Sequence, residues 1–368
     1  MSLLGNAGSP ELSLLIRLCL LPERVPAQEF SLIDEKRLLE LAHWHGVKNL
    51  VFAAMPPESR DGWLYQQLQA SATHATFHSL NQTNQLLNLI ELFDKSKIPV
   101  FAYKGVAWSK WLYNDLNSRT SGDIDLLVPR AYFVQALKEV EKLGFKPDEY
   151  RHHLLSHSAE IRKAFFRTDY HVPMYNDEGV MLELHWQPAY SRLCFEFPDD
   201  EWYDWQQPLV IQNHTINAFR NEYQLLLLLL HHAGKEQWAK LKYLADLTAY
   251  LYRYADTTDW DLVLSLAAQR GMKGLLQHSL AMINTLIVNH SFAIPEKSKR
   301  NMGDFLQKWD KMEELPENST WPYFVHAMRE RDGITHRFKV VRSHIQYFTE
   351  FNLLKEKMLW YRQKGDLL

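Results

Sequence analysis

Through the first quarter of the chain, apolar residues recur at the three- and four-residue spacing of an amphipathic helix. Leu38 and Ala42 show this spacing, and they follow Ser31 and Asp34, either of which can cap the start of a helix. The same spacing continues to the end of this stretch. We therefore expect an N-terminal helical region over residues 1–95.

At Ile98 the pattern changes to short apolar runs separated by turns and helical segments. Residues 98–103 form a run typical of a short buried strand. Lys104 and Gly105 then form a turn, and residues 106–116 return to helical spacing. The expected local order is strand, glycine turn and helix.

The rest of the middle third also alternates between strand and helix patterns. Residues 123–128 are a second strand candidate, which Pro129 ends. Residues 131–143 form an amphipathic pattern, with Gly144 just past the expected end of the helix. Two apolar runs, at residues 170–175 and 180–186, flank an Asn-Asp-Glu-Gly turn at residues 176–179. This arrangement predicts a hairpin. We therefore expect a mixed α/β core over residues 96–212.

From Asn221 the helical spacing returns, and it continues to the end of the chain with interruptions at three prolines. This pattern predicts a C-terminal helical region over residues 213–368. The three parts together predict an α+β fold, in which a short mixed sheet with its own helices is flanked by two helical regions.

The composition is that of a globular protein and argues against several classes of function. Apolar residues make up 46% of the chain and charged residues 23%. Lys and Arg number 41 against 44 Asp and Glu, so a formal net charge of −3 gives no support to nucleic acid as a partner. The longest apolar runs, such as Leu225–Leu230, are far shorter than the ~20 residues of a membrane span.

The same features suggest where the protein acts. The N-terminus lacks the basic segment of a secretion signal. Cys19 and Cys194 are the only cysteines, and so few suit a reducing compartment. We expect a cytoplasmic protein with no membrane partner.

The candidate chemistry begins with two acids in the second predicted strand. Asp123 and Asp125 are two residues apart, so both side chains leave the same face of a sheet, while Ile124 points to the other face. Adjacent carboxylates repel each other unless a cation neutralises them, and Mg²⁺ commonly binds one or two carboxylates together with substrate phosphates. The pair therefore favours Mg²⁺ and a nucleotide, although an Asp-x-Asp sequence can also simply begin a surface strand.

A third acid is expected beside this pair. In residues 181–186, Glu183 and His185 alternate onto one face of the predicted strand, and Leu182 and Leu184 alternate onto the other. If this strand lies in the same sheet as the two aspartates, Glu183 completes a cluster of three carboxylates.

Phosphate-binding groups are expected around the first turn. Lys104 and Gly105 lie between a strand and a helix, where free backbone N–H groups favour phosphate and glycine allows its close approach. Arg119 can clamp a phosphate through two hydrogen bonds. Each has an ordinary alternative, namely a solvated lysine, a plain turn and a surface ion pair.

A second group of polar residues lies in the last third. Lys235, Trp238, Lys242 and Asp246 are three or four residues apart and are expected on one helical face. Such a face can close over a nucleotide. Alternatively, Trp238 packs in the core and the lysines are solvated.

Three further features have weaker support. His153 and His157 have the spacing of zinc ligands on a helix, but no third ligand is evident, which favours surface histidines. His171, on the first arm of the hairpin, either lines the cleft or packs in the core. Residues 335–368 carry seven basic and three acidic residues among aromatic ones, which suits either a weak RNA-binding face or ordinary core packing.

Several strings of the sequence resemble one known family. They are Ile98-Pro-Val-Phe-Ala-Tyr-Lys-Gly105, Ser118-Arg119, Gly122-Asp-Ile-Asp-Leu-Leu-Val128 and Leu182-Glu-Leu-His-Trp186, with outer segments at residues 38–47 and 232–246. Together they resemble an uncharacterised nucleotidyltransferase family of the DNA polymerase β-like nucleotidyltransferase superfamily. The resemblance covers roughly residues 30–255.

The resemblance implies a minimal nucleotidyltransferase core with Asp123 and Asp125 as metal ligands and Glu183 as the third acid. One departure concerns the turn: better-studied enzymes of the superfamily carry a Gly-Ser pair there, whereas this chain has Lys104 and Gly105, followed by Val106.

These observations lead to one main hypothesis. The chain is expected to be an enzyme that transfers a nucleoside monophosphate from an NTP to a hydroxyl or phosphate acceptor, with Mg²⁺ as cofactor. The acceptor, whether protein, RNA or small molecule, is left open. The residues expected to bind the nucleotide are Lys104, Gly105, Arg119, Lys235 and Lys242. The alternative is a non-catalytic nucleotide-binding or partner-docking module that retains the fold.

Overall fold

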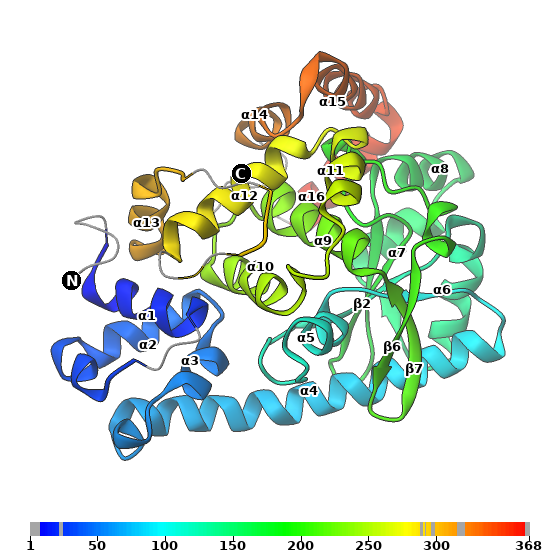
Figure 1. Cartoon of the computed structure of the whole chain (residues 1–368). Coiled ribbons are helices and arrows are strands. Elements are labelled where there is room, and N and C mark those ends of the chain that lie inside the picture. The colour runs from blue at the N-terminus through cyan, green and yellow to red at the C-terminus, as the bar shows by residue number, and fades with distance from the viewer. Residues whose placement is uncertain are drawn as a thin grey trace.

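The architecture is taken from a computed structural model, which describes residues 8–21, 25–287, 290, 292–295, 299–314 and 321–364 (Figure 1). The fold is α+β, as the sequence predicted: a five-stranded mixed sheet and a two-stranded hairpin lie among many helices. None of the helices in the described part of the chain combines the length and the apolar character that a membrane crossing requires.

The N-terminal region is helical, as predicted. Its α-helices are α1 (Pro10–Leu20), α2 (Glu35–Trp44), α3 (Lys48–Ala54) and the long α4 (Trp63–Lys95). Of the two polar residues expected to cap α2, Asp34 does so, because its side chain accepts hydrogen bonds from the backbone N–H groups of Lys36 and Arg37. Helix α4 runs along the base of the molecule in Figure 1, from the N-terminal helices to the sheet.

The main sheet has the strand order β1-β2-β5-β4-β3. Its strands are β1 (Phe101–Ala102), β2 (Asp123–Leu127), β3 (Lys146–Pro147), β4 (His171–Tyr175) and β5 (Met181–His185). Strands β2 and β5 are parallel and the other pairs are antiparallel, including the predicted β4–β5 hairpin. The helices between the strands are α5 (Gly105–Tyr113), α6 (Phe133–Glu141), α7 (Glu149–Ser156) and α8 (Ala159–Thr168).

One face of this sheet is fully apolar. The even-numbered residues of β2 and β5, among them Ile124 and Leu182, belong to one buried cluster with Ile90 and Phe93 of α4 and with α6. Because side chains alternate along a strand, the odd-numbered residues then face the opposite side. Burial of the apolar face therefore fixes where the acidic side chains lie.

A second hairpin, β6 (Gln206–Ile211) and β7 (His214–Phe219), lies beside β1. The sequence-based expectation that residues from 213 onward are helical is wrong for β7. The strands carry many exposed polar side chains and so lack a strong apolar alternation. The expected boundary at residue 212 falls in the turn of this hairpin, and helix formation begins with α9 at Asn221.

The remaining chain is helical in its described parts. It contains α9 (Asn221–Leu229), a π-helical segment (Leu230–Lys235), α10 (Leu241–Tyr254), α11 (Trp260–Gln269), α12 (Lys273–Leu286), α13 (Gly303–Asp310), α14 (Trp321–Arg329), α15 (Gly333–Phe348) and α16 (Phe351–Lys364). Leucines of α9 and α10 share one buried cluster with residues of α1, α2 and α5. The N-terminal and C-terminal helices therefore form a common core beside the sheet.

Candidate active site

The acidic side chains lie on the polar face of the sheet. Strand β2 directs Asp123 and Asp125 there, and the parallel register of β5 sets Glu183 directly opposite Asp125. Leu182 and Leu184 are fully buried on the other face, which is the register that the sequence predicted. Ligand atoms of Asp125, Glu183 and His185 all lie within 4.8 Å of one another.

Lys104 supplies a positive charge at the centre of this group. Its Nζ donates a hydrogen bond to Asp125 Oδ1 at 2.7 Å, and both side chains are almost completely buried. The Lys104 backbone has φ +58° and ψ −157°, a conformation that residues other than glycine rarely adopt and that surrounding contacts must hold in place. The buried ion pair is the side-chain contact by which Lys104 joins this turn to β2.

Gly105 is required by the same turn. It has φ +46°, and a Cβ added there would lie 3.1 Å from the carbonyl oxygen of Asp123. The turn is therefore pressed against the start of β2, and the first turn of α5 begins beside the carboxylates. This placement agrees with the role in phosphate binding expected for Lys104 and Gly105, which remains a prediction.

Two histidines join the cluster through their ring nitrogens. His185 Nε2 is 3.1 Å from both Asp125 Oδ1 and Glu183 Oε2. On the neighbouring strand, His171 Nε2 is 3.4 Å from Glu183 Oε1, and its Nδ1 is 3.7 Å from Asp169 Oδ1. Of the two roles open for His171, the structure thus favours the one in the site. Asp169 was not identified from the sequence because it precedes the strand and follows no alternation.

These contacts determine the protonation of the acids. Burial disfavours ionisation of Asp125, but the Lys104 ammonium and a hydrogen bond from His185 outweigh it and lower the pKa. Burial likewise opposes ionisation of Glu183, while hydrogen bonds from His171 and His185 hold its pKa well below the usual range. In contrast, the charge of Asp125, together with burial, raises the pKa of Asp123 to about 6.

The pKa values of the two histidines of the cluster also shift in opposite directions. Burial lowers the pKa of His171, but hydrogen bonds to Asp169 and Glu183 more than compensate and raise it. Burial and the charge of Lys104 lower the pKa of His185. With Asp123 ionised above about pH 6, the four carboxylates of Asp123, Asp125, Asp169 and Glu183 outnumber the basic groups that pair with them, Lys104 and His171, so the cluster carries excess negative charge. Carboxylate oxygens with this excess negative charge fit a divalent cation.

Arg119 lies beside the turn, and the buried carboxylate of Asp246 holds its guanidinium in place. Its Nε donates to Asp246 Oδ2 at 2.9 Å, and its Nη1 is 3.5 Å from the carbonyl oxygen of Gly105. Asp246 is buried and also accepts from Tyr113 at 2.9 Å and contacts His232 Nε2 at 2.9 Å. Burial by itself raises the pKa of Asp246. The charge of the Arg119 guanidinium is the largest of the effects that outweigh burial and lower this pKa to about 2. Arg119 is thus held by a charged residue of α10, whatever else it binds.

The expectation that four polar residues share one helical face in the last third is wrong. Lys235 ends the π-helical segment, and residues 236–240 are not helical. Gln237 and Trp238 have positive φ angles, which turn the chain before α10 begins. Lys242 in α10 lies over the Tyr243 ring, whereas Lys235 pairs with Glu236 at 3.3 Å. The nucleotide-binding role of either lysine stays a prediction.

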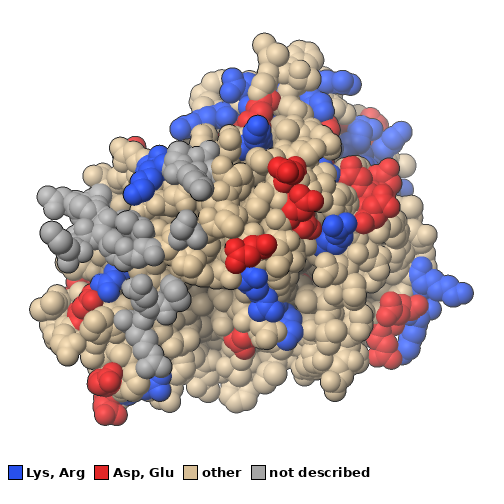
Figure 2. Space-filling view, in the orientation of Figure 1, with Lys and Arg blue, Asp and Glu red and all other residues tan. Residues whose placement is uncertain are grey.

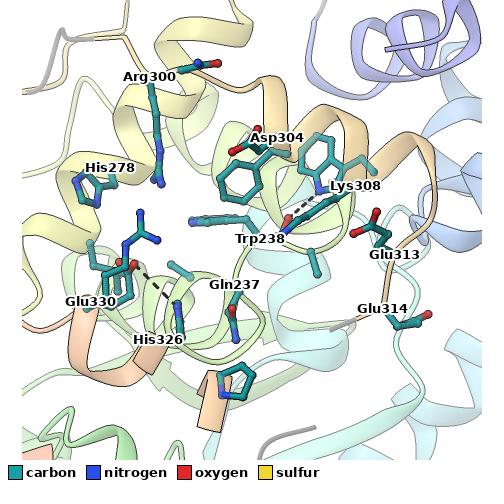
Figure 3. A pocket seen from close by; sticks show the side chains of 18 residues that line it. Gln237, Trp238, His278, Arg300, Asp304, Lys308, Glu313, Glu314, His326 and Glu330 are labelled. Carbon is teal, nitrogen blue, oxygen red and sulfur yellow. Dashed lines mark hydrogen bonds and ion pairs between the residues drawn. The ribbon is translucent and has the colours of Figure 1, made fainter. Parts of the chain in front are cut away.

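Trp238 instead lines a separate cavity of about 440 Å³ among α12, α13 and α14. Figure 3 shows His278, Arg300 and Glu330 on one side of this cavity and Lys308, Glu313 and Glu314 on the other. Its basic and acidic side chains are therefore mixed, and they give the cavity no clear preference for an anion or a cation.

The histidine pair of α7 does find a third partner, which the sequence did not reveal. Glu356 of α16 places Oε2 at 3.7 Å from His153 Nε2 and 3.5 Å from His157 Nε2. However, the backbone N–H of Ser158 donates to His157 Nδ1 at 2.8 Å. A neutral His157 then carries its proton on Nε2, where a metal would need a lone pair. The arrangement favours hydrogen bonding to Glu356, in keeping with surface histidines.

The charged side chains on one face of the molecule do not identify a nucleic-acid partner. On the face shown in Figure 2, basic and acidic side chains lie in small separate groups, with more basic ones toward α14 and α15. In α15 and α16 the aromatic residues Phe338 and Phe351 are exposed rather than packed in a core. Neither observation identifies a partner.

Comparison with known proteins agrees with the sequence motifs. The sequence model of a family described as uncharacterised nucleotidyltransferases matches residues 31–287. This match confirms the resemblance found above, and it supports nucleotidyl transfer as an enzymatic activity. No curated protein matches the chain.

Two solved structures are similar at low sequence identity. One is the solution structure of the antibiotic-resistance factor ANT(2'')-Ia, with 16% identity and a TM-score of 0.37, covering 54% of this chain and 97% of that one. The other is a crystal structure of an antigenic nucleotidyltransferase-like protein from Paracoccidioides brasiliensis, with 16% identity and a TM-score of 0.30, covering 53% of this chain and 92% of that one.

Replacing Lys104 by Met should destabilise the protein strongly in metal-free buffer. The variant leaves Asp125 buried without its ammonium partner, which typically costs about 3–5 kcal/mol of unfolding free energy. Urea unfolding at pH 7.5 measures this loss. The control Lys138→Met removes an exposed lysine of α6 and should change the free energy by less than about 0.5 kcal/mol. Equal, small effects in both variants would contradict a structural role for the ion pair.

The raised pKa of Asp123 predicts a pH dependence of stability in metal-free buffer. The folded state holds this proton up to about pH 6, whereas an unfolded Asp releases it near pH ~3.9. Its contribution to stability is therefore present below pH ~4 and is lost as pH rises through 6. Asp123→Asn should remove this component, so the unfolding free energy of the variant should rise relative to that of the wild type between pH ~4 and 6. Parallel unfolding free energies from pH 4 to 7 would rule out the raised pKa.

Proposed function

This chain belongs to the family of uncharacterised nucleotidyltransferases, and we propose that it transfers a nucleoside monophosphate from an NTP to an acceptor with the help of Mg²⁺. In this reaction an oxygen of the acceptor forms a bond to the α-phosphorus, the bond from the α-phosphorus to the bridging oxygen breaks, and pyrophosphate leaves. An acceptor hydroxyl gives up its proton to water in the same reaction. The observation that carries the proposal is the close group of Asp125, Glu183 and His185 beside the turn that begins α5, with Asp123 on the same face of β2.

Asp123, Asp125 and Glu183 would hold the metal, and His185 would position Asp125 and Glu183 through hydrogen bonds from its Nε2. When bound, Mg²⁺ neutralises phosphate charge and polarises the phosphorus for attack. The excess negative charge of the cluster supports this role, because a divalent cation would balance it. Lys104 would then be free to contact a phosphate, since the cation takes over its pairing with Asp125.

Glu183 is better suited to binding a cation than to accepting a proton. The alternative role, in which Glu183 takes the proton of an acceptor hydroxyl, needs a carboxylate whose pKa is near the working pH. Hydrogen bonds from His171 and His185 instead keep Glu183 ionised. In the proposed enzyme these two histidines are therefore positioning residues for the metal ligand.

The backbone of α5 would meet the donor phosphates. Its first turn carries free N–H groups, and Gly105 allows an oxygen to approach the main chain beside Asp123. Arg119 lies within 3.5 Å of the Gly105 carbonyl oxygen and adds a guanidinium on the same side. Of the expected phosphate ligands, Lys104, Gly105 and Arg119 thus lie together, which supports assigning them to one donor site.

Removing both aspartates should abolish the activity. Purified protein is incubated with α-labelled NTPs and a cell lysate, and label is followed into protein, RNA and small molecules. We expect Asp123→Asn with Asp125→Asn to lower labelling by about 10³-fold or more, as loss of the metal ligands removes most of the electrostatic stabilisation. Asp177→Asn, a change at an exposed turn residue, should label normally. Tight NTP binding in calorimetry without labelling of any acceptor would instead favour a non-catalytic nucleotide-binding module.

Metal binding itself is tested by thermal unfolding. A cation that binds only the folded state stabilises it, so Mg²⁺ should raise the melting temperature of the wild type. Glu183→Gln keeps the size of the side chain and removes one ligand charge, so the shift should be much smaller. The control Glu178→Gln changes an exposed acid of the β4–β5 turn and should keep the full shift. The same shift in Glu183→Gln as in the wild type would exclude Glu183 as a ligand.

A further inference from the structure

A second cavity, of about 300 Å³, lies next to the candidate active site. Three parts of the chain form its wall: the α2–α3 junction with Lys48, the middle of α4 with His74, His78 and Gln82, and the loop that carries Arg119. The N-terminal helices thus reach a position beside the catalytic loop, although they are remote from it in sequence.

The residues that line this cavity include no acid. Lys48 and Arg119 bring positive charge, and His74 and His78 add imidazole donors one helical turn apart on α4. In the part of the chain that the structure describes, Lys48 forms no ion pair. A wall of this kind, with many donors and no carboxylate, suits an anionic ligand.

A further lysine reaches the same wall from the C-terminal helices. The aliphatic part of the Lys242 side chain packs against Gly46, which lines the cavity. A Cβ added at Gly46 would lie 3.0 Å from Lys242 Cδ. Among the described residues, Lys242 has no carboxylate at ion-pair distance. Burial and the nearby charge of Arg119 lower its pKa. Three basic side chains therefore lie around the cavity, and of these three only Arg119 pairs with Asp246.

Gln82 gives independent evidence of a missing ligand. Its side chain is only 3% exposed, and within the described residues its Nε2 has no hydrogen-bond partner. A buried amide donor without a partner is costly, so such groups commonly belong to a binding site. An anion in the cavity would supply the missing acceptor.

The cavity is connected to the carboxylate cluster through Ser121. This residue lines the cavity, and its Oγ is 3.0 Å from Asp123 Oδ1. Val106, in the first turn of α5, lines it as well. A triphosphate whose α-phosphate lies at the carboxylates can thus extend past Ser121 into the cavity.

We propose that this cavity binds the two terminal phosphates of the NTP donor and the pyrophosphate released from it, with Lys48, His78 and Gln82 as ligands from the N-terminal helical region. The proposal rests on the nucleotidyl transfer proposed above. It assigns a function to the N-terminal helices: they complete the donor site that the short sheet leaves open.

Direct binding of inorganic pyrophosphate tests the proposal without any turnover. The full chain is titrated calorimetrically with pyrophosphate in EDTA, so that protein side chains alone neutralise the ligand. Lys48→Ala should raise the Kd about tenfold or more, the usual effect of losing one charge-assisted hydrogen bond. The control Lys36→Ala removes an exposed lysine of α2 outside the cavity and should leave the Kd within about twofold.

A second pair of variants adds a negative charge instead of removing a positive one. His78→Glu places a carboxylate on the cavity wall at an exposed position of α4 and should abolish measurable pyrophosphate binding. Asn81→Glu places the same charge on the same helix outside the cavity and should bind as the wild type does. Circular dichroism of each variant confirms that the fold is retained.

The outcomes separate this proposal from the proposed function. If pyrophosphate binds and both cavity variants weaken it, the anion site stands even where no acceptor is ever labelled. If the wild type does not bind pyrophosphate, or if Lys48→Ala and His78→Glu bind it as tightly as their controls, the anion site is refuted, even for an enzyme that transfers nucleotides through Asp123 and Asp125.

Discussion

The ion pair between Lys104 and Asp125 holds the acidic face of the sheet together with the turn that begins α5. Both charges are almost completely removed from water, which is unfavourable unless each has a close partner, and the 2.7 Å contact provides one. It also stabilises a backbone conformation at Lys104 that is otherwise rarely adopted. This turn sets the direction of α5, whose Trp108 and Trp111 then hydrogen-bond to Gln224 and Asn221 of α9. One electrostatic contact on the sheet therefore orients the helical core beside it.

A second buried pair, Arg119 with Asp246, connects the loop before β2 to α10. Because Asp246 also binds Tyr113 of α5, the start of β2, helix α5 and the C-terminal helices form a single hydrogen-bonded unit. The buried cluster that α1 and α2 share with α9 and α10 extends this unit to the N-terminal helices. The site is thus built by all three parts of the chain, and the short sheet alone does not complete it.

The sequence predicts those features that follow from local alternation. The parity of Leu182, Glu183 and Leu184 predicted which face of β5 carries the acid, because an apolar core tolerates only one register. Contacts between residues that are distant in sequence produce no such pattern. The spacing of Lys104 and Asp125, or of Arg119 and Asp246, does not indicate that they are in contact. The hairpin of β6 and β7 was missed for a related reason, since strands exposed to solvent need no apolar alternation.

The same limits explain why the helical face expected in the last third does not exist. Helical spacing over residues 235–246 was compatible with one continuous helix, but the chain turns at Gln237 and Trp238 through positive φ angles. Trp309 donates a hydrogen bond to the Trp238 carbonyl oxygen at 2.9 Å, so a residue about seventy positions away supports this turn. Spacing records local preference, whereas tertiary packing decides where a helix ends.

The charge balance of the site links metal, phosphate and Lys104 in the proposed reaction. Without a divalent cation, Lys104 compensates Asp125, and His171 compensates Asp169 and Glu183. A cation bound by the carboxylates would take over this task and would leave the Lys104 ammonium without a partner in a buried place, where an unpaired charge is unfavourable. A donor phosphate at α5 would restore the balance. Metal and nucleotide should therefore favour each other's binding, because each removes the electrostatic cost that the other creates at Lys104.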